Sequence, residues 1–173
     1  MLMQYVARMH PDVADTRTDV DERSADTPGP EALILSAGIY NIPLFLRNHA
    51  SPADIASIYS SIISGAFGTD SAVYQGVSPV AGKFDQGTWK EGKLLVLAHS
   101  YDDELVERAQ RDVMCVALDR QGWSIVMEDD DEEGREDGKR VLEVRDIQGT
   151  HDFVWEDGVE CAKLIREVVE RLG

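Results

Sequence analysis

The chain has 173 residues, and its 33 acidic side chains far exceed its 17 basic ones, which gives a formal net charge of −16. This charge argues against binding to naked nucleic acid or to anionic membranes at ordinary salt, and no apolar run approaches the ~18 residues of a membrane span. An apolar share of 43% with only two cysteines indicates a cytoplasmic globular protein without a disulfide framework.

The types of charged residue suggest two explanations of the acidity. Asp outnumbers Glu and Arg outnumbers Lys, a bias that resembles cytoplasmic proteins of salt-loving archaea. In molar salt the screening length falls to about 3 Å, so like charges no longer repel one another strongly. The alternative is an acidic protein that covers a basic partner, as immunity proteins and nucleic-acid mimics do.

The chain divides near residue 30. Residues 1–30 predict a short N-terminal strand followed by a flexible acidic segment with few large apolar side chains. Residues 31–173 predict a single α+β domain, in which the apolar stretch 32–46 contains a helix near 31–38.

A second helix is predicted over residues 51–64. Ser51 is a suitable N-cap residue and Pro52 suits the first helical position. Five apolar side chains repeat at helical spacing and are expected to form one buried stripe. They are Ile55, Ile58, Tyr59, Ile62 and Ile63.

From residue 93 onward the pattern becomes regular. Strands are predicted at 93–98, 113–118, 123–127, 140–147 and 152–155, with a helix at 102–111 and an amphipathic C-terminal helix that Asp157 caps. Short connections between the later strands favour hairpins. The predicted fold is therefore an α+β domain with a mixed, mostly antiparallel sheet, one βαβ unit and a C-terminal amphipathic helix.

The stretch LAHSYDDE, residues 97–104, joins a predicted strand to a predicted helix. Ser100 and Asp103 fit a capping box, which places Asp102, Asp103 and Glu104 in the first helical turn. Negative side chains are favoured there by the helix dipole, typically by ~0.3–1 kcal/mol each. Helix capping thus accounts for these carboxylates without a catalytic role.

The same stretch also resembles the AHPDDE zinc motif of the LmbE/PIG-L deacetylases. In that family the histidine and one aspartate bind zinc, and another aspartate is the base. The resemblance implies a small metal-dependent hydrolase centred on His99, with Asp102 and Asp103 beside it. The sequence departs from the motif because Ser100 and Tyr101 replace a single proline.

Other candidate residues have weaker support for a catalytic or metal-binding role. His151, followed by Asp152, is the only plausible distant partner for His99, while Cys115 and Cys161 are expected to be core thiols. Residues 128–140 resemble an EF-hand loop but have Arg140 where calcium binding needs a glutamate. No cofactor and no metal ligand set is predicted.

Residues 44–61, LFLRNHASPADIASIYSS, resemble the first two helices of winged helix-turn-helix domains. The resemblance implies a DNA-binding regulator. However, no basic side chain occurs between Arg47 and Lys83, whereas a DNA-contacting surface needs Lys or Arg for the phosphates.

The favoured hypothesis from sequence is a non-catalytic acidic protein that binds a protein partner, forms a homo-oligomer, or serves in a larger assembly such as a virion assembled in the cytoplasm of a halophilic host. The basis is an acidic N-terminal segment beside an apolar stretch, an arrangement that can become ordered on a neighbouring subunit. The winged-helix regulator and the His99-centred hydrolase are the alternatives.

The halophile hypothesis predicts a strong dependence of stability on salt. The melting temperature should keep rising from ~0.1 M to several molar KCl, beyond the range in which screening saturates. Thermal unfolding followed by circular dichroism across this range measures the effect. A melting temperature that stays flat would instead favour the basic-partner explanation of the acidity.

Overall fold

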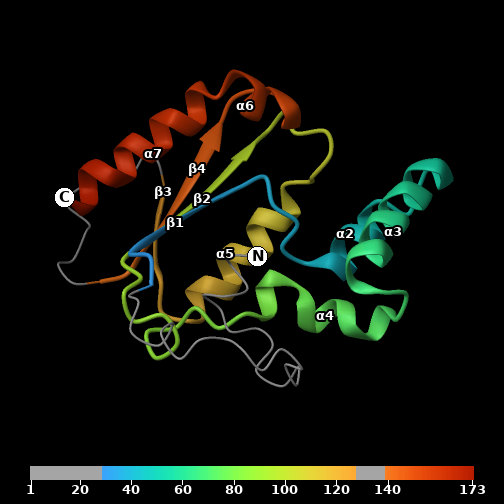
Figure 1. The fold of residues 1–173 in the computed structure, drawn as a ribbon, viewed down its shortest axis with the longest axis horizontal. Coiled ribbons are helices and arrows are strands. Elements are labelled where there is room, and N and C mark those ends of the chain that lie inside the picture. The colour runs from blue at the N-terminus through green and yellow to red at the C-terminus, as the bar shows by residue number, and fades with distance from the viewer. Residues whose placement is uncertain (1–28, 128–138) are drawn as a thin grey trace, which may run out of the picture.

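The computed structural model describes residues 29–127 and 139–173 and contains one four-stranded sheet (Figure 1). Its strands are β1 (Ala32–Ser36), β2 (Leu94–Ser100), β3 (Ser124–Met127) and β4 (Val141–Ile147). Their order is β1-β2-β4-β3, and each of the three neighbouring pairs is parallel. The predicted mostly antiparallel α+β sheet is therefore wrong, and the fold is of the α/β type.

Helices and short 3-10 turns lie between strands or follow the last strand, β4. The helices are α2 (Ile42–Asn48), α3 (Ala53–Phe67), α4 (Tyr74–Val77), α5 (Ala109–Asp119), α6 (His151–Asp157) and α7 (Val159–Leu172), and the 3-10 turns are η2 (Ser71–Val73) and η3 (Pro79–Ala81). Within the described ranges, no helix is both long and apolar enough to cross a membrane.

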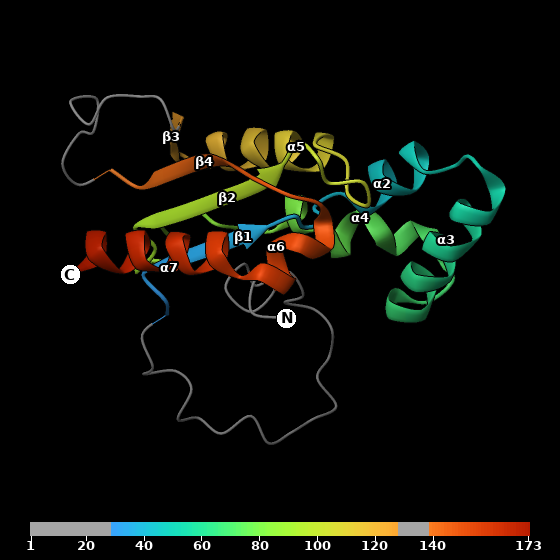
Figure 2. The same cartoon turned by 90° about the horizontal axis from the view of Figure 1, so that it is seen from above.

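Helices cover both faces of the sheet. Figure 2 shows α5 on one face and α7 on the other. Every residue of β2 is buried, because its side chains alternate between two cores. Leu95 and Leu97 join Met114 of α5, whereas Val96 packs with Leu164 of α7. Burial on both faces explains the continuous apolar run of this strand.

Three predicted elements have the wrong secondary structure. The apolar stretch near 31–38 contains β1 rather than a helix, residues 113–118 belong to α5, and residues 152–155 belong to α6. Periodicity alone cannot separate short apolar strands from short buried helices. The expected hairpin before β3 is absent as well, since α5 precedes this strand and β3 runs parallel to β4.

Helix α3 confirms the predicted element but not its buried stripe. It begins at Ala53, with Pro52 as the capping residue. Ile63 is buried, whereas Ile55, Ile58 and Ile62 are exposed. The reason is that the helical segment α2–α4 lies beside the sheet rather than on it (Figure 1).

The C-terminal helix α7 is confirmed, although Gly158 rather than Asp157 occupies its capping position. Residues 1–28 and 128–138 lie outside the described residues. The predicted N-terminal strand, the acidic segment and most of the EF-hand-like loop fall there, so the division of the chain near residue 30 stays a prediction.

Buried charges also hold α7 on the sheet. Glu143, in the middle of β4, is only 3% exposed. Its carboxylate accepts hydrogen bonds from both terminal nitrogens of Arg171 and lies 2.9 Å from Nη2 of Arg145. Arg145 also reaches Glu167 of α7. This network balances the burial of a carboxylate in a sheet strand.

Removal of the Glu143 charge should destabilise the fold strongly. Glu143→Gln should lower the free energy of unfolding by about 3 kcal/mol, because it removes the buried carboxylate charge that both Arg171 and Arg145 contact. The exposed Glu170, 3.9 Å from Arg166, offers the control: Glu170→Gln should change stability by less than ~0.5 kcal/mol. Urea unfolding measures both, and equal effects would contradict the role assigned to the buried network.

Candidate functional site

The candidate site lies where β2 and β4 end. The two strands are parallel neighbours, and Ser100 stands opposite Ile147 at the last position of their register. Residues 101–108 then lead to α5, and residues 148–150 lead to α6. In Figure 1 both arrowheads point toward α6. Ligand sites of open α/β sheets commonly lie outside the carboxyl ends of parallel strands.

Asp103 and His151 meet across the two connections. Nδ1 of His151 lies 2.9 Å from Oδ2 of Asp103. The Asp103 side chain is fully buried, whereas 22% of the His151 side chain remains exposed. Because Nδ1 faces a carboxylate, we assign the imidazole proton to Nδ1, and Nε2 then carries the free lone pair. Within the described residues, Nε2 makes no hydrogen bond.

The backbone fixes the Asp103 carboxylate. Its Oδ1 accepts hydrogen bonds from the N–H groups of Leu105 at 3.0 Å and Val106 at 2.9 Å. Both carboxylate oxygens are thus occupied, which offsets the cost of burying the charge. The carbonyl of Leu105 accepts a hydrogen bond from the hydroxyl of Tyr59, so α3 also contacts this connection.

An ion-pair cluster lies behind the site. Asp146 of β4 accepts hydrogen bonds from Arg111, at 2.6 Å, and from Arg108. Arg111 is 5% exposed, and the Arg108 guanidinium lies 3.5 Å from the centroid of the Tyr101 ring. These contacts tie the start of α5 and the β2 connection to the end of β4.

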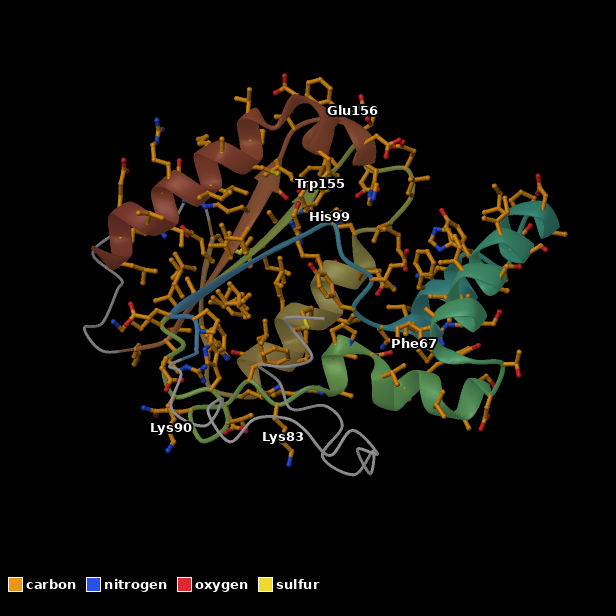
Figure 3. The ribbon with its side chains drawn as sticks, viewed as in Figure 1. Phe67, Lys83, Lys90, His99, Trp155 and Glu156 are labelled. Atoms are coloured by element: carbon orange, nitrogen blue, oxygen red, sulfur yellow. The ribbon has the colours of Figure 1, made fainter. Side chains whose placement is uncertain are left out.

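His99 lies in the interior of the fold, next to the site, and not on the protein surface (Figure 3). It is 1% exposed, and its Nδ1 has no hydrogen-bond partner among the described residues. Burial lowers the pKa of His99; Arg111 and Arg108 act in the same direction, whereas Asp103 and a hydrogen bond with the Val106 backbone oppose it. A buried neutral imidazole results.

The predicted helix start in the LAHSYDDE stretch is wrong. Ser100 is the last residue of β2, and α5 begins only at Ala109. The Ser100 hydroxyl accepts a hydrogen bond from the N–H of Asp102, not of Asp103. Asp102 and Glu104 are exposed. Of the three acidic side chains, that of Asp103 contacts the imidazole of His151, and that of Glu104 accepts a hydrogen bond from the His151 backbone N–H.

The other predicted residues are distributed around the fold. Asp152 is exposed next to His151. Cys115 lies on α5, not on a strand, and Cys161 lies on α7; burial raises the pKa of both thiols, which disfavours the reactive thiolate. Residues 29–127 and 139–173 contain no group of three His, Cys, Asp or Glu side chains placed to hold a metal ion.

The pairing of Asp103 with His151 was missed from sequence, although both residues were noted. The sequence indicates His151 only as a partner of His99 and predicts a strand directly after it, at 152–155. The signal that could have found the pair is the two predicted strands, 93–98 and 140–147, each of which is followed within a few residues by a polar candidate residue. If these strands are parallel neighbours, Asp103 and His151 lie at the same edge of the sheet.

Comparison with known proteins gives one informative match. The chain is 31% identical over 144 residues to a kynurenine formamidase-like hydrolase of Fusarium equiseti. The match covers 83% of this chain but 42% of that protein, so the chain spans less than half of the relative's length. No family model and no solved structure matches the chain.

This similarity overturns the favoured hypothesis from sequence. A relative named as a hydrolase points to an enzyme, so the interpretation as a non-catalytic binding protein or assembly component is wrong. The hydrolase alternative agrees better with the match. The expectation of a protein partner or homo-oligomer stays a prediction.

The buried, neutral state of His99 should affect how the free energy of unfolding depends on pH. Its folded-state pKa lies below the unfolded value of about 6.5, so the unfolded chain binds the proton first as the pH falls. His99 should therefore contribute a loss of stability below about pH 6.5, with a slope of up to ~1.4 kcal/mol per pH unit.

Urea unfolding of the wild type and of His99→Gln between pH 7.5 and 5 tests this expectation. The difference in unfolding free energy between the two proteins should shrink or change sign as the pH falls, because Gln does not titrate. Parallel pH curves would show that the folded state protonates His99 as readily as the unfolded chain does.

Proposed function

We propose that the chain carries the acid–base pair of a hydrolase, with His151 as general base and Asp103 as the carboxylate that orients it. The observation that carries the proposal is the 2.9 Å contact between Nδ1 of His151 and the buried Asp103. A carboxylate that fixes the imidazole tautomer and stabilises the imidazolium is the arrangement found in hydrolytic triads.

The proposed reaction transfers an acyl group to water. Nε2 of His151 takes the proton from an attacking hydroxyl group while the oxygen forms a bond to the substrate carbonyl carbon. Nε2 then returns the proton to the leaving nitrogen or oxygen as the carbon–heteroatom bond breaks. If the attacking hydroxyl belongs to a side chain, a water molecule then cleaves the resulting acyl-enzyme ester: Nε2 takes a proton from the water and returns it to the side-chain oxygen as the ester bond breaks. In either case Asp103 keeps its charge, and water supplies the hydrogen and hydroxyl of the two products.

The order of the pair along the chain agrees with the proposal. In α/β hydrolases the nucleophile precedes the acidic residue, which precedes the histidine. Asp103 and His151 follow that order, each a few residues after one of two neighbouring parallel strands. We assign the attacking oxygen either to water or to a hydroxyl side chain that precedes Asp103. No hydroxyl within the described residues is hydrogen-bonded to His151.

The relative suggests the substrate class. Its name refers to a formamidase, and we extend to this chain the hydrolysis of amides or esters with a small acyl group. The cytoplasmic location expected from the sequence is part of the same proposal.

Hydrolysis of p-nitrophenyl acetate and N-formylaniline by the purified full chain tests the proposal. His151→Ala should lower kcat by roughly 10²–10⁴-fold, and Asp103→Asn should do the same because it disturbs the tautomer of His151. A burst of p-nitrophenol equal to the enzyme concentration would identify a side-chain nucleophile rather than water.

Asp152→Asn is the matched control, since it removes the same charge from an exposed position adjacent to His151. It should leave kcat within about twofold of the wild type. The proposal fails if His151→Ala hydrolyses both substrates at the wild-type rate, or if Asp152→Asn is as damaging as Asp103→Asn.

A further inference from the structure

The acid–base pair depends on the relative position of the connections that follow β2 and β4. The backbone hydrogen bonds of the sheet do not extend into these connections. The register of β2 and β4 ends at Ser100 and Ile147, whereas Asp103 and His151 lie three and four residues farther along. Small shifts of either connection would separate Nδ1 from the carboxylate. Contacts other than the backbone pairing of the strands must therefore keep the pair together.

The Ser100 hydroxyl makes such a contact with each of the two connections. Its Oγ donates a hydrogen bond to the carbonyl of Gly149 at 2.5 Å and accepts one from the N–H of Asp102 at 3.1 Å. Gly149 lies two residues before His151, and Asp102 directly precedes Asp103. Ser100 is 3% exposed and belongs to a fully buried strand, so one fixed hydroxyl joins both connections.

The Gly149 side of this contact is also constrained. Gly149 has a φ of +103°, and a Cβ atom there would lie 2.3 Å from Cδ1 of Phe153. Only glycine therefore fits this turn without displacement of the ring. One residue later, the Thr150 side chain caps α6 by accepting a hydrogen bond from the N–H of Phe153. The turn that Ser100 holds thus leads directly into the helix that begins with His151.

Glu104 adds a second, weaker contact. Its Oε2 accepts a hydrogen bond from the backbone N–H of His151 at 3.2 Å. Glu104 is exposed, so water competes for this bond. Ser100, which is buried, is the stronger of the two.

We propose that Ser100 is a positioning residue that clamps the turn before His151 to the connection carrying Asp103, so that its hydroxyl sets the geometry of the acid–base pair. This inference rests on the proposed function. A purely structural serine would affect stability alone, whereas a positioning serine must also change the hydrogen bond between His151 and Asp103.

Two readouts distinguish these roles. The solvent exchange rate of the His151 Nδ1 proton, measured by NMR, reports on the bond to Asp103 without any need for activity. Ser100→Ala should accelerate this exchange by about tenfold or more, because the bond opens more often. It should also lower kcat by roughly 10–10²-fold at nearly unchanged KM, as expected for misplacement of a catalytic group.

Conservative variants guard against a simple failure to fold. Ser100→Thr keeps the hydroxyl and should restore both slow exchange and most of kcat. Ser100→Cys keeps nearly the same size with a weak hydrogen-bond donor, and should resemble Ser100→Ala in exchange and kcat.

Ser78 provides the matched control. Ser78 is fully buried, as Ser100 nearly is. Its hydroxyl also accepts a hydrogen bond from a backbone N–H group, that of Ile42, and donates one to a backbone carbonyl, that of Tyr74. Ser78→Ala should lower the melting temperature as Ser100→Ala does, but it should leave proton exchange and kcat unchanged.

The inference is overturned if Ser100→Ala and Ser100→Cys lose stability while the Nδ1 proton exchanges at the wild-type rate. It is also overturned if Ser78→Ala accelerates exchange equally. Failure of the proposed function looks different: His151→Ala would then retain full activity, while the exchange experiment would still report whether Ser100 holds the pair.

Discussion

Parallel pairing of β2 with β4 is the constraint on which the candidate site depends. Because the strands run in the same direction, the connections that follow them start at one edge of the sheet. Asp103 and His151 can then meet although 48 residues separate them in sequence. The helices support this pairing from both faces (Figure 2). An antiparallel arrangement would place the ends of the two strands at opposite edges and separate the pair.

The charges at the site are balanced locally, although the whole chain is strongly acidic. The buried Asp103 carboxylate is bound by two backbone N–H groups and by His151. Asp146 is neutralised by Arg108 and Arg111. His99, which lies deeper, is kept neutral chiefly by burial. The buried charges thus have partners within the site, and His151, whose side chain is 22% exposed, is the group that solvent can reach.

The sequence allowed prediction of the elements whose pattern is long and regular. Strand β2 was found because a continuous apolar run marks it, and helix α7 because an amphipathic repeat marks it. Strand β4 was found although Glu143, Arg145 and Asp146 interrupt its apolar residues. Residues 113–118 were misassigned because a run of six apolar residues fits a buried strand as well as a segment of α5, in which Met114 and Leu118 are buried and Val116 is exposed. Misassignment of residues 152–155 as a strand had the larger consequence: it hid α6, the helix that begins with His151 after the short connection from β4. Strand direction depends on contacts between distant segments, so local pattern could not supply it.

The misinterpretation of Ser100 and Asp103 as a capping box has a physical origin. Capping and site formation use the same interaction, an oxygen of a short polar side chain that accepts hydrogen bonds from free backbone N–H groups a few residues later. Asp103 forms such bonds with Leu105 and Val106, and Ser100 with Asp102. In a helix these bonds would satisfy the first turn, whereas here they hold a non-helical connection in one conformation. The remaining oxygen of Asp103 is thereby directed at His151, so a motif that local sequence assigns to helix initiation serves to fix a carboxylate.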